Sequence, residues 1–335
     1  MKNIIYLIFW LITISPCLAQ KVNISKTVLW EKGIGNYTNY RIPSIITSKK
    51  GTLLAFCEAR ESGDTGDIDV LMKRSTDNGI TWSDESIVWS DGGNTCGNPT
   101  PVIDHQTGRI WLFLTWNHGD DNETQIIHKK SKFPRLPYLS FSDDDGLTWS
   151  EPKNMNDSCR NPSWGWYANG PGVGIQIKKG KFKGRLVIPS NHSYDDINGK
   201  IRNGPFNYGA HVLFSDNNGS SWEISDSIFP GCNESQIVEL ENGDLMMNMR
   251  SYNNQFSRAY SVSNDGGYSW SKIKHDYQLV ESKCQASILN YGNFNNKNMY
   301  LFSNPAVPKG RTNMTIKTSF DNCKTWINSK VIHSG

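Results

Sequence analysis

One eight-residue pattern recurs five times along this chain and constrains its fold more than any other feature. Its shared form is Ser-x-Asp-x-Gly-x-Thr/Ser-Trp, with Asn217 replacing Asp in the third copy and Cys323 replacing Gly in the fifth. The copies are STDNGITW at Ser75–Trp82, SDDDGLTW at Ser142–Trp149, SDNNGSSW at Ser215–Trp222, SNDGGYSW at Ser263–Trp270 and SFDNCKTW at Ser319–Trp326. Spacings of 48 to 73 residues between copies predict stacked or radially arranged units rather than one irregular core.

Each copy carries the chemistry of a hairpin turn. The Asp side chain accepts hydrogen bonds from backbone N–H groups that follow it, Gly supplies a positive φ, and Trp anchors the turn in the core. We therefore interpret the copies as structural elements and not as catalytic ones. Each interval between copies has room for about one four-stranded sheet, and five or six such sheets around an axis form a β-propeller.

The segments between the copies are typical of an all-β protein. Short apolar runs bounded by Gly, Asn, Pro or Asp predict strands, and no amphipathic helix of ten or more residues is expected. The predicted strands include Thr52–Cys57, Val70–Arg74, Ile110–Trp116, Val173–Ile177, Arg185–Pro189, Ala210–Ser215, Gln236–Glu241, Asp244–Arg250 and Met299–Ser303. The longest irregular segments, 91–98 and 154–171, are expected to be loops that build a pocket on one face.

Composition and charge exclude several classes of function. A net charge of +3 spread over 335 residues argues against a nucleic-acid partner. Residues 1–19 resemble a secretory signal peptide, which leaves a domain at 20–335 and predicts a secreted, periplasmic or extracellular protein without a transmembrane segment. The cysteines form no CxxC or Cys/His cluster, which argues against a zinc site, and no metal or organic cofactor is expected for the chemistry.

A few charged residues stand in apolar or turn-rich surroundings. Taken alone, each is interpreted as a solvated side chain or a salt bridge at the end of a strand. The set comprises Arg41 in Tyr-Arg-Ile-Pro, Arg60 and Asp64 in Glu-Ala-Arg-Glu-Ser-Gly-Asp, Glu234 in Cys-Asn-Glu-Ser-Gln, Arg250 at the end of Leu-Met-Met-Asn-Met-Arg, and Arg311 after Val-Pro-Lys-Gly.

Together with the repeats, this ordered set resembles the sialidases (neuraminidases) of the bacterial and animal type, the exo-α-sialidases with Asp boxes (BNR repeats). The resemblance runs from about Val28 to the C-terminus and includes Gly97-Asn-Pro-Thr-Pro, Gly170-Pro-Gly-Val-Gly-Ile-Gln and Cys284-Gln-Ala-Ser. It implies a six-bladed β-propeller whose central pocket binds terminal sialic acid of glycoproteins, glycolipids or oligosaccharides.

The resemblance also assigns substrate-binding roles. Arg41, Arg250 and Arg311 match an arginine triad that holds the sugar carboxylate, for which the planar guanidinium fork is well suited. Three cations in one pocket repel one another and therefore demand an anion. Arg60 matches a further pocket arginine near the acetamido and 4-hydroxyl groups of the sugar. Asn98 stands where many relatives carry Asp for that hydroxyl, so this contact is expected to be altered.

Asp64 matches the general acid/base of the family, at the family spacing of nine residues before Lys73. Such a group must protonate the departing oxygen and then deprotonate water, so it needs a position near the leaving group and an adjustable pKa. Asp67 and Asp69 are competing candidates, and Asp69 is expected to make structural hydrogen bonds instead.

Glu234, sixteen residues before Arg250, matches the glutamate that activates a tyrosine nucleophile. A neutral phenol avoids the like-charge repulsion that a carboxylate nucleophile would meet beside the carboxylate of the substrate. Relatives carry this tyrosine after the last repeat, whereas the last tyrosine here is Tyr300, in a strand before Arg311. We therefore expect a C-terminally truncated chain with an incomplete last blade. The leading hypothesis is a retaining exo-α-sialidase that acts through a tyrosyl-enzyme intermediate. The alternatives are a lectin-like propeller that binds sialic acid without turnover, and a trans-sialidase.

Overall fold

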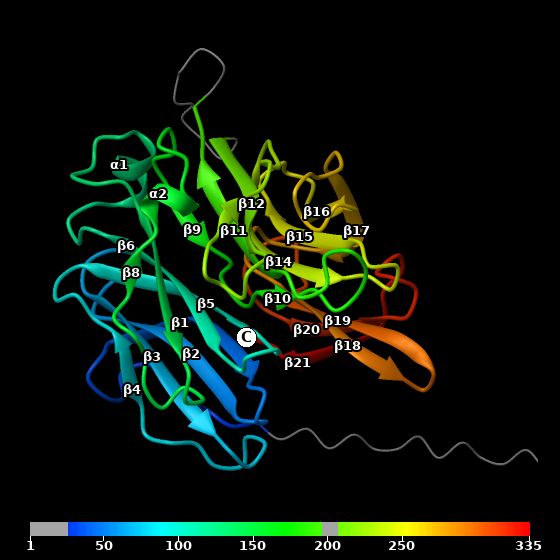
Figure 1. Ribbon diagram of the computed structural model, residues 1–335, viewed down its shortest axis with the longest axis horizontal. Helices are drawn as coiled ribbons and strands as arrows, with labels where there is room; N and C mark the ends of the chain where they lie inside the picture. Colours follow the sequence, from blue (N-terminus) through cyan, green and yellow to red (C-terminus); the bar gives the residue numbers. More distant parts are fainter. Residues whose placement is uncertain (1–25, 196–206) are drawn as a thin grey trace, which may run out of the picture.

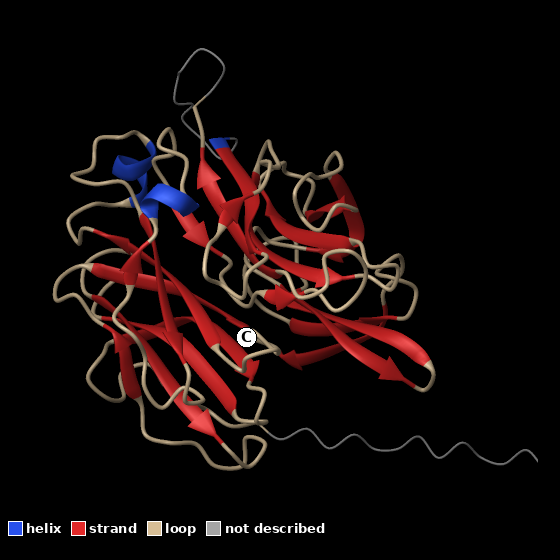
Figure 2. Cartoon of the chain, viewed as in Figure 1, coloured by secondary structure: helices blue, strands red, loops and turns tan. Residues whose placement is uncertain are grey.

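The structure, a computed structural model, describes residues 26–195 and 207–335. Within them lie 21 strands and two short helices, α1 (Glu123–Ile127) and α2 (Asn156–Cys159), so the all-β prediction is confirmed (Figure 2). The expected signal peptide at 1–19 lies outside the described residues. Among the residues described, no helix is both long and apolar enough to cross a membrane.

The strands form five successive units that are joined by antiparallel pairing within each unit. The first contains β1 (Asn39–Thr47), β2 (Leu53–Arg60), β3 (Ile68–Ser75) and β4 (Ser86–Trp89), and the second contains β5 (Thr95–Ile103), β6 (Ile110–Asn117), β7 (Leu136–Ser142) and β8 (Lys153–Asn154). The third contains β9 (Tyr167–Asn169), β10 (Ile175–Gln176), β11 (Leu186–Ser193), β12 (Tyr208–Ser215) and β13 (Glu223–Ile224). The fourth contains β14 (Cys232–Glu239), β15 (Leu245–Ser251), β16 (Ser257–Ser263) and β17 (Lys274–Val280), and the fifth contains β18 (Ser287–Phe294), β19 (Lys297–Pro305), β20 (Met314–Ser319) and β21 (Ile327–His333).

The units follow one another around the middle of the molecule, from the first in blue to the fifth in orange and red (Figure 1). A single parallel contact, Ile68 with Thr95, joins the first two units into one sheet. The residues described thus contain five units, and the count of six blades stays a prediction.

The five sequence repeats occupy equivalent places in these units. The first Ser of every copy is the last residue of β3, β7, β12, β16 or β20, so each copy forms the turn that leads to the outermost strand. In the first copy, Asp77 accepts hydrogen bonds from Ser75 Oγ at 2.8 Å and from the Thr81 backbone N–H at 2.9 Å. Trp82 Nε1 donates to the Gly79 carbonyl at 3.2 Å. The interpretation of the repeats as structural turns is therefore confirmed.

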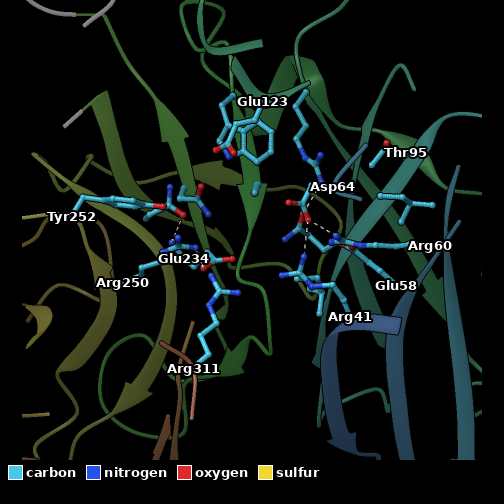
Figure 3. Close-up of a pocket in the computed structure, with 18 residues that line it drawn as sticks. Arg41, Glu58, Arg60, Asp64, Thr95, Glu123, Glu234, Arg250, Tyr252 and Arg311 are labelled. Carbon is cyan, nitrogen blue, oxygen red and sulfur yellow. Dashed lines mark hydrogen bonds and ion pairs between the residues drawn. The ribbon is translucent and has the colours of Figure 1, made fainter. Parts of the chain in front are cut away.

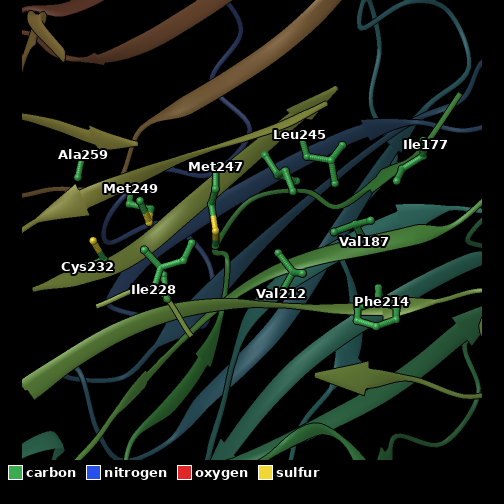
Figure 4. Packing of buried hydrophobic residues seen from close by; sticks show 12 residues of the cluster. Ile177, Val187, Val212, Phe214, Ile228, Cys232, Leu245, Met247, Met249 and Ala259 are labelled. Atoms are coloured by element: carbon green, nitrogen blue, oxygen red, sulfur yellow. The ribbon is translucent and has the colours of Figure 1, made fainter. Parts of the chain in front are cut away.

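The hydrophobic core lies between neighbouring units rather than inside one of them. Val187 and Val212 of the third unit pack with Met247 and Met249 of the fourth, and all four are fully buried (Figure 4). Comparable clusters lie between the first and second, the second and third, and the fourth and fifth units. Because full burial of each large apolar side chain contributes about 1.5–3 kcal/mol, these faces hold adjacent sheets together.

The segment at Pro171 and Gly172 ties distant units to one another. The Gly172 carbonyl accepts a hydrogen bond from Ser44 Oγ of β1 at 2.7 Å. The Pro171 carbonyl accepts from Gln236 Nε2 of β14 at 3.1 Å and from Gln285 Nε2, just before β18. The first, third, fourth and fifth units therefore meet at this segment.

Candidate functional site

A cavity of about 200 Å³ opens where all five units converge (Figure 3). The charged side chains predicted from the sequence reach it from β1, β2, β5, β14 and β15, and from the loops that follow β2 and β19. Every site residue predicted from the sequence lines this one cavity: Arg41, Arg60, Asp64, Asn98, Glu234, Arg250 and Arg311. The structure therefore brings together groups that lie up to 270 residues apart in the sequence.

Irregular strand register positions three of these side chains. A β-bulge turns a strand locally and aims a side chain away from the regular alternation. Arg41, Asn98 and Glu234 each lie at such a register break, in β1, β5 and β14 respectively. Ile42 beside Arg41 has a φ of 55°, which is rare for a β-branched residue and indicates backbone strain at the site.

Asp64 lies between two arginines. Its Oδ1 accepts a hydrogen bond from Arg41 Nη1 at 2.9 Å and another from Arg60 Nη1 (Figure 3). Desolvation raises the pKa of Asp64, but the hydrogen bond from Arg60 and the charges of Arg60, Arg41 and Arg311 outweigh it, so the pKa lies below its usual value. The side chain is 76% exposed, so a ligand in the cavity can reach it.

The competing aspartates lie elsewhere. Asp69 is buried and accepts a hydrogen bond from the Tyr37 hydroxyl at 2.6 Å, in keeping with the structural role expected for it. Neither Asp67 nor Asp69 is among the residues that line the cavity. Of the three aspartates, Asp64 is therefore the one placed to contact a ligand in the cavity.

Glu234 and Arg250 form a second ion pair, on the opposite side of the cavity. Glu234 Oε2 accepts a hydrogen bond from Arg250 Nη1 at 2.6 Å, and both side chains are 18% exposed. Burial lowers the pKa of Arg250, but the charge of Glu234 raises it by a larger amount. The pKa therefore lies above its usual value, and the guanidinium remains ionised. Arg250 also lies 4.9 Å from the ring centroid of Tyr252. Burial raises the pKa of Tyr252 to about 12, which keeps the phenol neutral.

Arg311 differs from the other two arginines of the predicted triad. It is exposed, it lies in the loop between β19 and β20, and it forms no ion pair with any described residue. Arg41 and Arg250, by contrast, already have counter-charges in the cavity, because they pair with Asp64 and Glu234 respectively. The cavity nevertheless keeps a positive excess, since its lining holds five arginines, Arg41, Arg60, Arg135, Arg250 and Arg311, against four carboxylates, Glu58, Asp64, Glu123 and Glu234.

The prediction of two long pocket loops is only partly right. Asn98 lies in β5 rather than in a loop, and 154–171 contains α2 and β9. Trp166 and Ala168 from the latter segment do line the cavity. The pocket is therefore built largely on strands, and strands hold side chains in more fixed positions than loops do.

Several lining residues were missed from the sequence. Glu58 is buried, and it pairs with Arg60 and accepts a hydrogen bond from the Asn98 backbone N–H at 2.6 Å. The sequence contained a pattern that could have identified it. Glu58 and Arg60 are opposite charges two positions apart in an apolar strand, so their side chains point to the same face of the sheet. Arg135, Glu123 and Tyr252 carried no comparable local signal, because their partners lie on other strands.

Comparisons with known proteins match most of the chain. The family model for the BNR repeat-like domain matches residues 51–335. A sialidase of Bacteroides fragilis is 32% identical over 88% of this chain and 55% of its own length. An exo-α-sialidase of Arthroderma benhamiae is 31% identical over 86% of this chain and 69% of its own length.

Solved structures show the same similarity. A Hadza microbial sialidase superposes with a TM-score of 0.79 at 33% identity, covering 89% of this chain and 60% of its own. A leech intramolecular trans-sialidase complexed with 2,7-anhydro-Neu5Ac superposes with a TM-score of 0.77 at 18% identity, covering 94% of this chain and 64% of its own, and this supports the fold alone. The chain spans about half the length of two curated sialidases that it matches, 55% of that from Bacteroides fragilis and 47% of that from Micromonospora viridifaciens.

Proposed function

The chain belongs to the sialidase family of BNR repeat-like proteins, and from this premise we propose that its cavity binds terminal sialic acid and hydrolyses the glycosidic bond that carries it. The substrates would be sialylated glycoproteins, glycolipids or oligosaccharides. The observation that carries the proposal is the convergence of Arg41, Arg250 and Arg311 on one cavity with a positive excess. A carboxylate-bearing sugar fits that excess, and a neutral sugar leaves it uncompensated.

Asp64 is proposed as the general acid/base. Its exposure and its place beside Arg41 support contact with the leaving oxygen of a sugar whose carboxylate is held by the same arginine. When that carboxylate takes over the Arg41 donor, Asp64 loses one stabilising hydrogen bond and its pKa rises toward the range in which it can donate a proton.

Glu234 is proposed to activate a tyrosine nucleophile, so that the reaction proceeds with retention through a tyrosyl-enzyme intermediate. Tyr252 is the tyrosine that lines the cavity among the described residues, and Tyr300 lies in the core between the fourth and fifth units. Tyr252 stacks on Tyr208 with ring centroids 5.4 Å apart and donates no hydrogen bond to Glu234. We therefore do not assign the nucleophile to Tyr252.

This position of Tyr252 favours a second candidate function, a lectin-like protein that binds sialic acid without turnover. Against it stand Asp64 and Glu234, because a pure lectin needs neither an acid nor an activating carboxylate. A trans-sialidase would use the same residues with a second sugar as acceptor.

Turnover of a fluorogenic α-sialoside by the purified chain distinguishes these functions. The hydrolase predicts release of the fluorophore by the wild type and its loss in Asp64→Ala, with no turnover of a matched neutral galactoside. Saturable binding of sialic acid without release would favour the lectin. Equal rates for the wild type and Asp64→Ala would remove Asp64 from its role.

We propose two further features of this protein. The five units, each of four or five strands, support a propeller, and we propose that the fold is a six-bladed one. We also propose that residues 1–19 direct export, so that the mature chain begins at Gln20. N-terminal sequencing of the secreted protein tests the second point, and a start other than Gln20 would contradict it.

A further inference from the structure

Asn98 is held on three sides before any ligand reaches it. Its backbone N–H donates to Glu58 Oε1 at 2.6 Å, and its φ of 51° belongs to a conformation that Asn tolerates better than most residues. Its side-chain oxygen Oδ1 accepts two hydrogen bonds, from Arg135 Nη2 at 2.7 Å and from Thr115 Oγ1 at 3.1 Å. The residue is 8% exposed and lines the cavity.

These contacts fix which end of the amide faces the cavity. A guanidinium has five N–H donors and no acceptor, so the Asn98 atom in contact with Arg135 must be the oxygen. The amide nitrogen Nδ2 then points away from Arg135, and it donates to no acceptor among the described residues. The Asn98 side chain therefore presents N–H donors to the cavity.

Arg135 is unusual because it is a buried charge without an ion-pair partner. It is 4% exposed and forms no ion pair with any described carboxylate. Neutral oxygens hold it instead: Asn117 Oδ1 at 2.5 Å from Nη1, together with Asn98 Oδ1 and Thr115 Oγ1. The guanidinium also stacks 4.7 Å from the ring centroid of Trp166. Burying a charge without hydrogen-bond partners costs free energy, so loss of any one of these acceptors would destabilise Arg135. The buried guanidinium therefore keeps each acceptor, including Asn98 Oδ1, in its place.

We propose that Arg135 is a positioning residue that locks the Asn98 amide with its donors toward the cavity, so that the ligand group lying there must be a hydrogen-bond acceptor. The ligand need not donate a proton at this point, so an ether oxygen serves there as well as a hydroxyl. An aspartate at the same position would present an acceptor, and it would instead require a hydroxyl or another donor. The identity of the ligand as a sialic acid rests on the proposed function.

The test compares binding of N-acetylneuraminic acid α-methyl glycoside with its 4-, 7-, 8- and 9-O-methyl ethers. For each ether, the ratio of its Kd to that of the parent is measured by calorimetry in the wild type and in Asn98→Asp. Steric effects of the methyl group cancel when the two ratios are compared. At one position we expect a ratio about tenfold or more higher in Asn98→Asp, because the carboxylate there loses its donor.

Two further variants separate positioning from simple structural support. Thr115→Val removes one contact to Oδ1 but leaves Arg135 in place, so the wild-type ratios are expected. Arg135→Met frees the amide to rotate, so its ratio at the same position should lie between those of the wild type and Asn98→Asp. If Arg135→Met does not fold, the comparison of the wild type, Thr115→Val and Asn98→Asp still decides whether Asn98 presents hydrogen-bond donors to the cavity.

Failure of the donor assignment and failure of the proposed function give different results. Binding of all ligands with ratios that agree within about twofold in the wild type and Asn98→Asp would overturn the donor assignment and leave the proposed function intact. Absence of binding of the parent glycoside to the wild type would instead overturn the proposed function, and this inference with it.

Discussion

The carboxylate of Asp64 accepts a hydrogen bond from Arg41 at 2.9 Å, so the proposed acid and one of the proposed carboxylate-binding arginines share a single contact. A ligand carboxylate at Arg41 competes for the same donor. Binding of the acidic group and the proton affinity of Asp64 are therefore coupled in this cavity.

This coupling predicts the direction of a pKa change. Burial raises the pKa of Asp64, but the hydrogen bond from Arg60 and the arginine charges outweigh it, so the value in the free protein lies below 3.8. Added N-acetylneuraminic acid should raise it, because Arg41 turns to the ligand. Titration of ¹³C-labelled aspartates with and without ligand measures both values, with Asp64→Asn identifying the signal. A pKa that falls on binding would contradict the coupling.

Asp64→Asn should affect substrates according to their leaving groups. A general acid contributes about 10²–10⁴-fold, and least where the departing group needs no protonation. We therefore expect a large loss of kcat/KM on sialyllactose and a much smaller loss on an aryl sialoside with an acidic phenol. Equal losses on both substrates would show that Asp64 does not protonate the leaving group.

Glu58→Gln should destabilise the fold around the site. Glu58 and Arg60 are 2% and 5% exposed, and removing one member of a buried pair costs about 3–5 kcal/mol of unfolding free energy. Urea unfolding measures this difference, and Glu61→Gln, an exposed neighbour, serves as the control. A loss no larger than that of the control would mean that Arg60 is held without Glu58.

Asp144→Asn should change how stability depends on pH. Partial burial raises the pKa of Asp144, but hydrogen bonds from the side chain and backbone of Thr148 and from Ser142 lower it overall to about 2. Its contribution is therefore complete above about pH 4 and is lost as the pH falls toward 2. Asn217 makes the same turn contacts in the third repeat without titrating, so the variant should fold and lose less stability between pH 5 and 2.5. An unchanged pH dependence in urea unfolding would contradict this.

The sequence predicted the repeated turns and the cavity residues because both follow local or family patterns. Asp77 and its equivalents accept hydrogen bonds from residues two to four positions away, so an eight-residue sequence pattern is enough to predict each turn. Arg41 and Arg250 could be placed in one pocket only through the ordered resemblance to sialidases.

The parts that escaped prediction depend on contacts between distant strands. Arg135 and Asn98 are 37 residues apart, and Glu58 and Asn98 are 40 apart. The register breaks at Arg41, Asn98 and Glu234 likewise depend on the partner strand. No periodic pattern in the sequence marks such a register break. The contacts among the residues that line the cavity could therefore be identified only from the structure.

The central claim, that Arg41, Arg250 and Arg311 hold an acidic sugar together, is tested most directly at Arg311. This residue is exposed and has no ion-pair partner among the described residues, so its replacement should not alter stability. Calorimetric titration with sialic acid should show Arg311→Met weakened by about 10- to 100-fold, as expected for a lost charge-assisted hydrogen bond. Lys309→Met, in the same loop but outside the cavity, should bind like the wild type. Equal affinities for all three proteins would contradict the account.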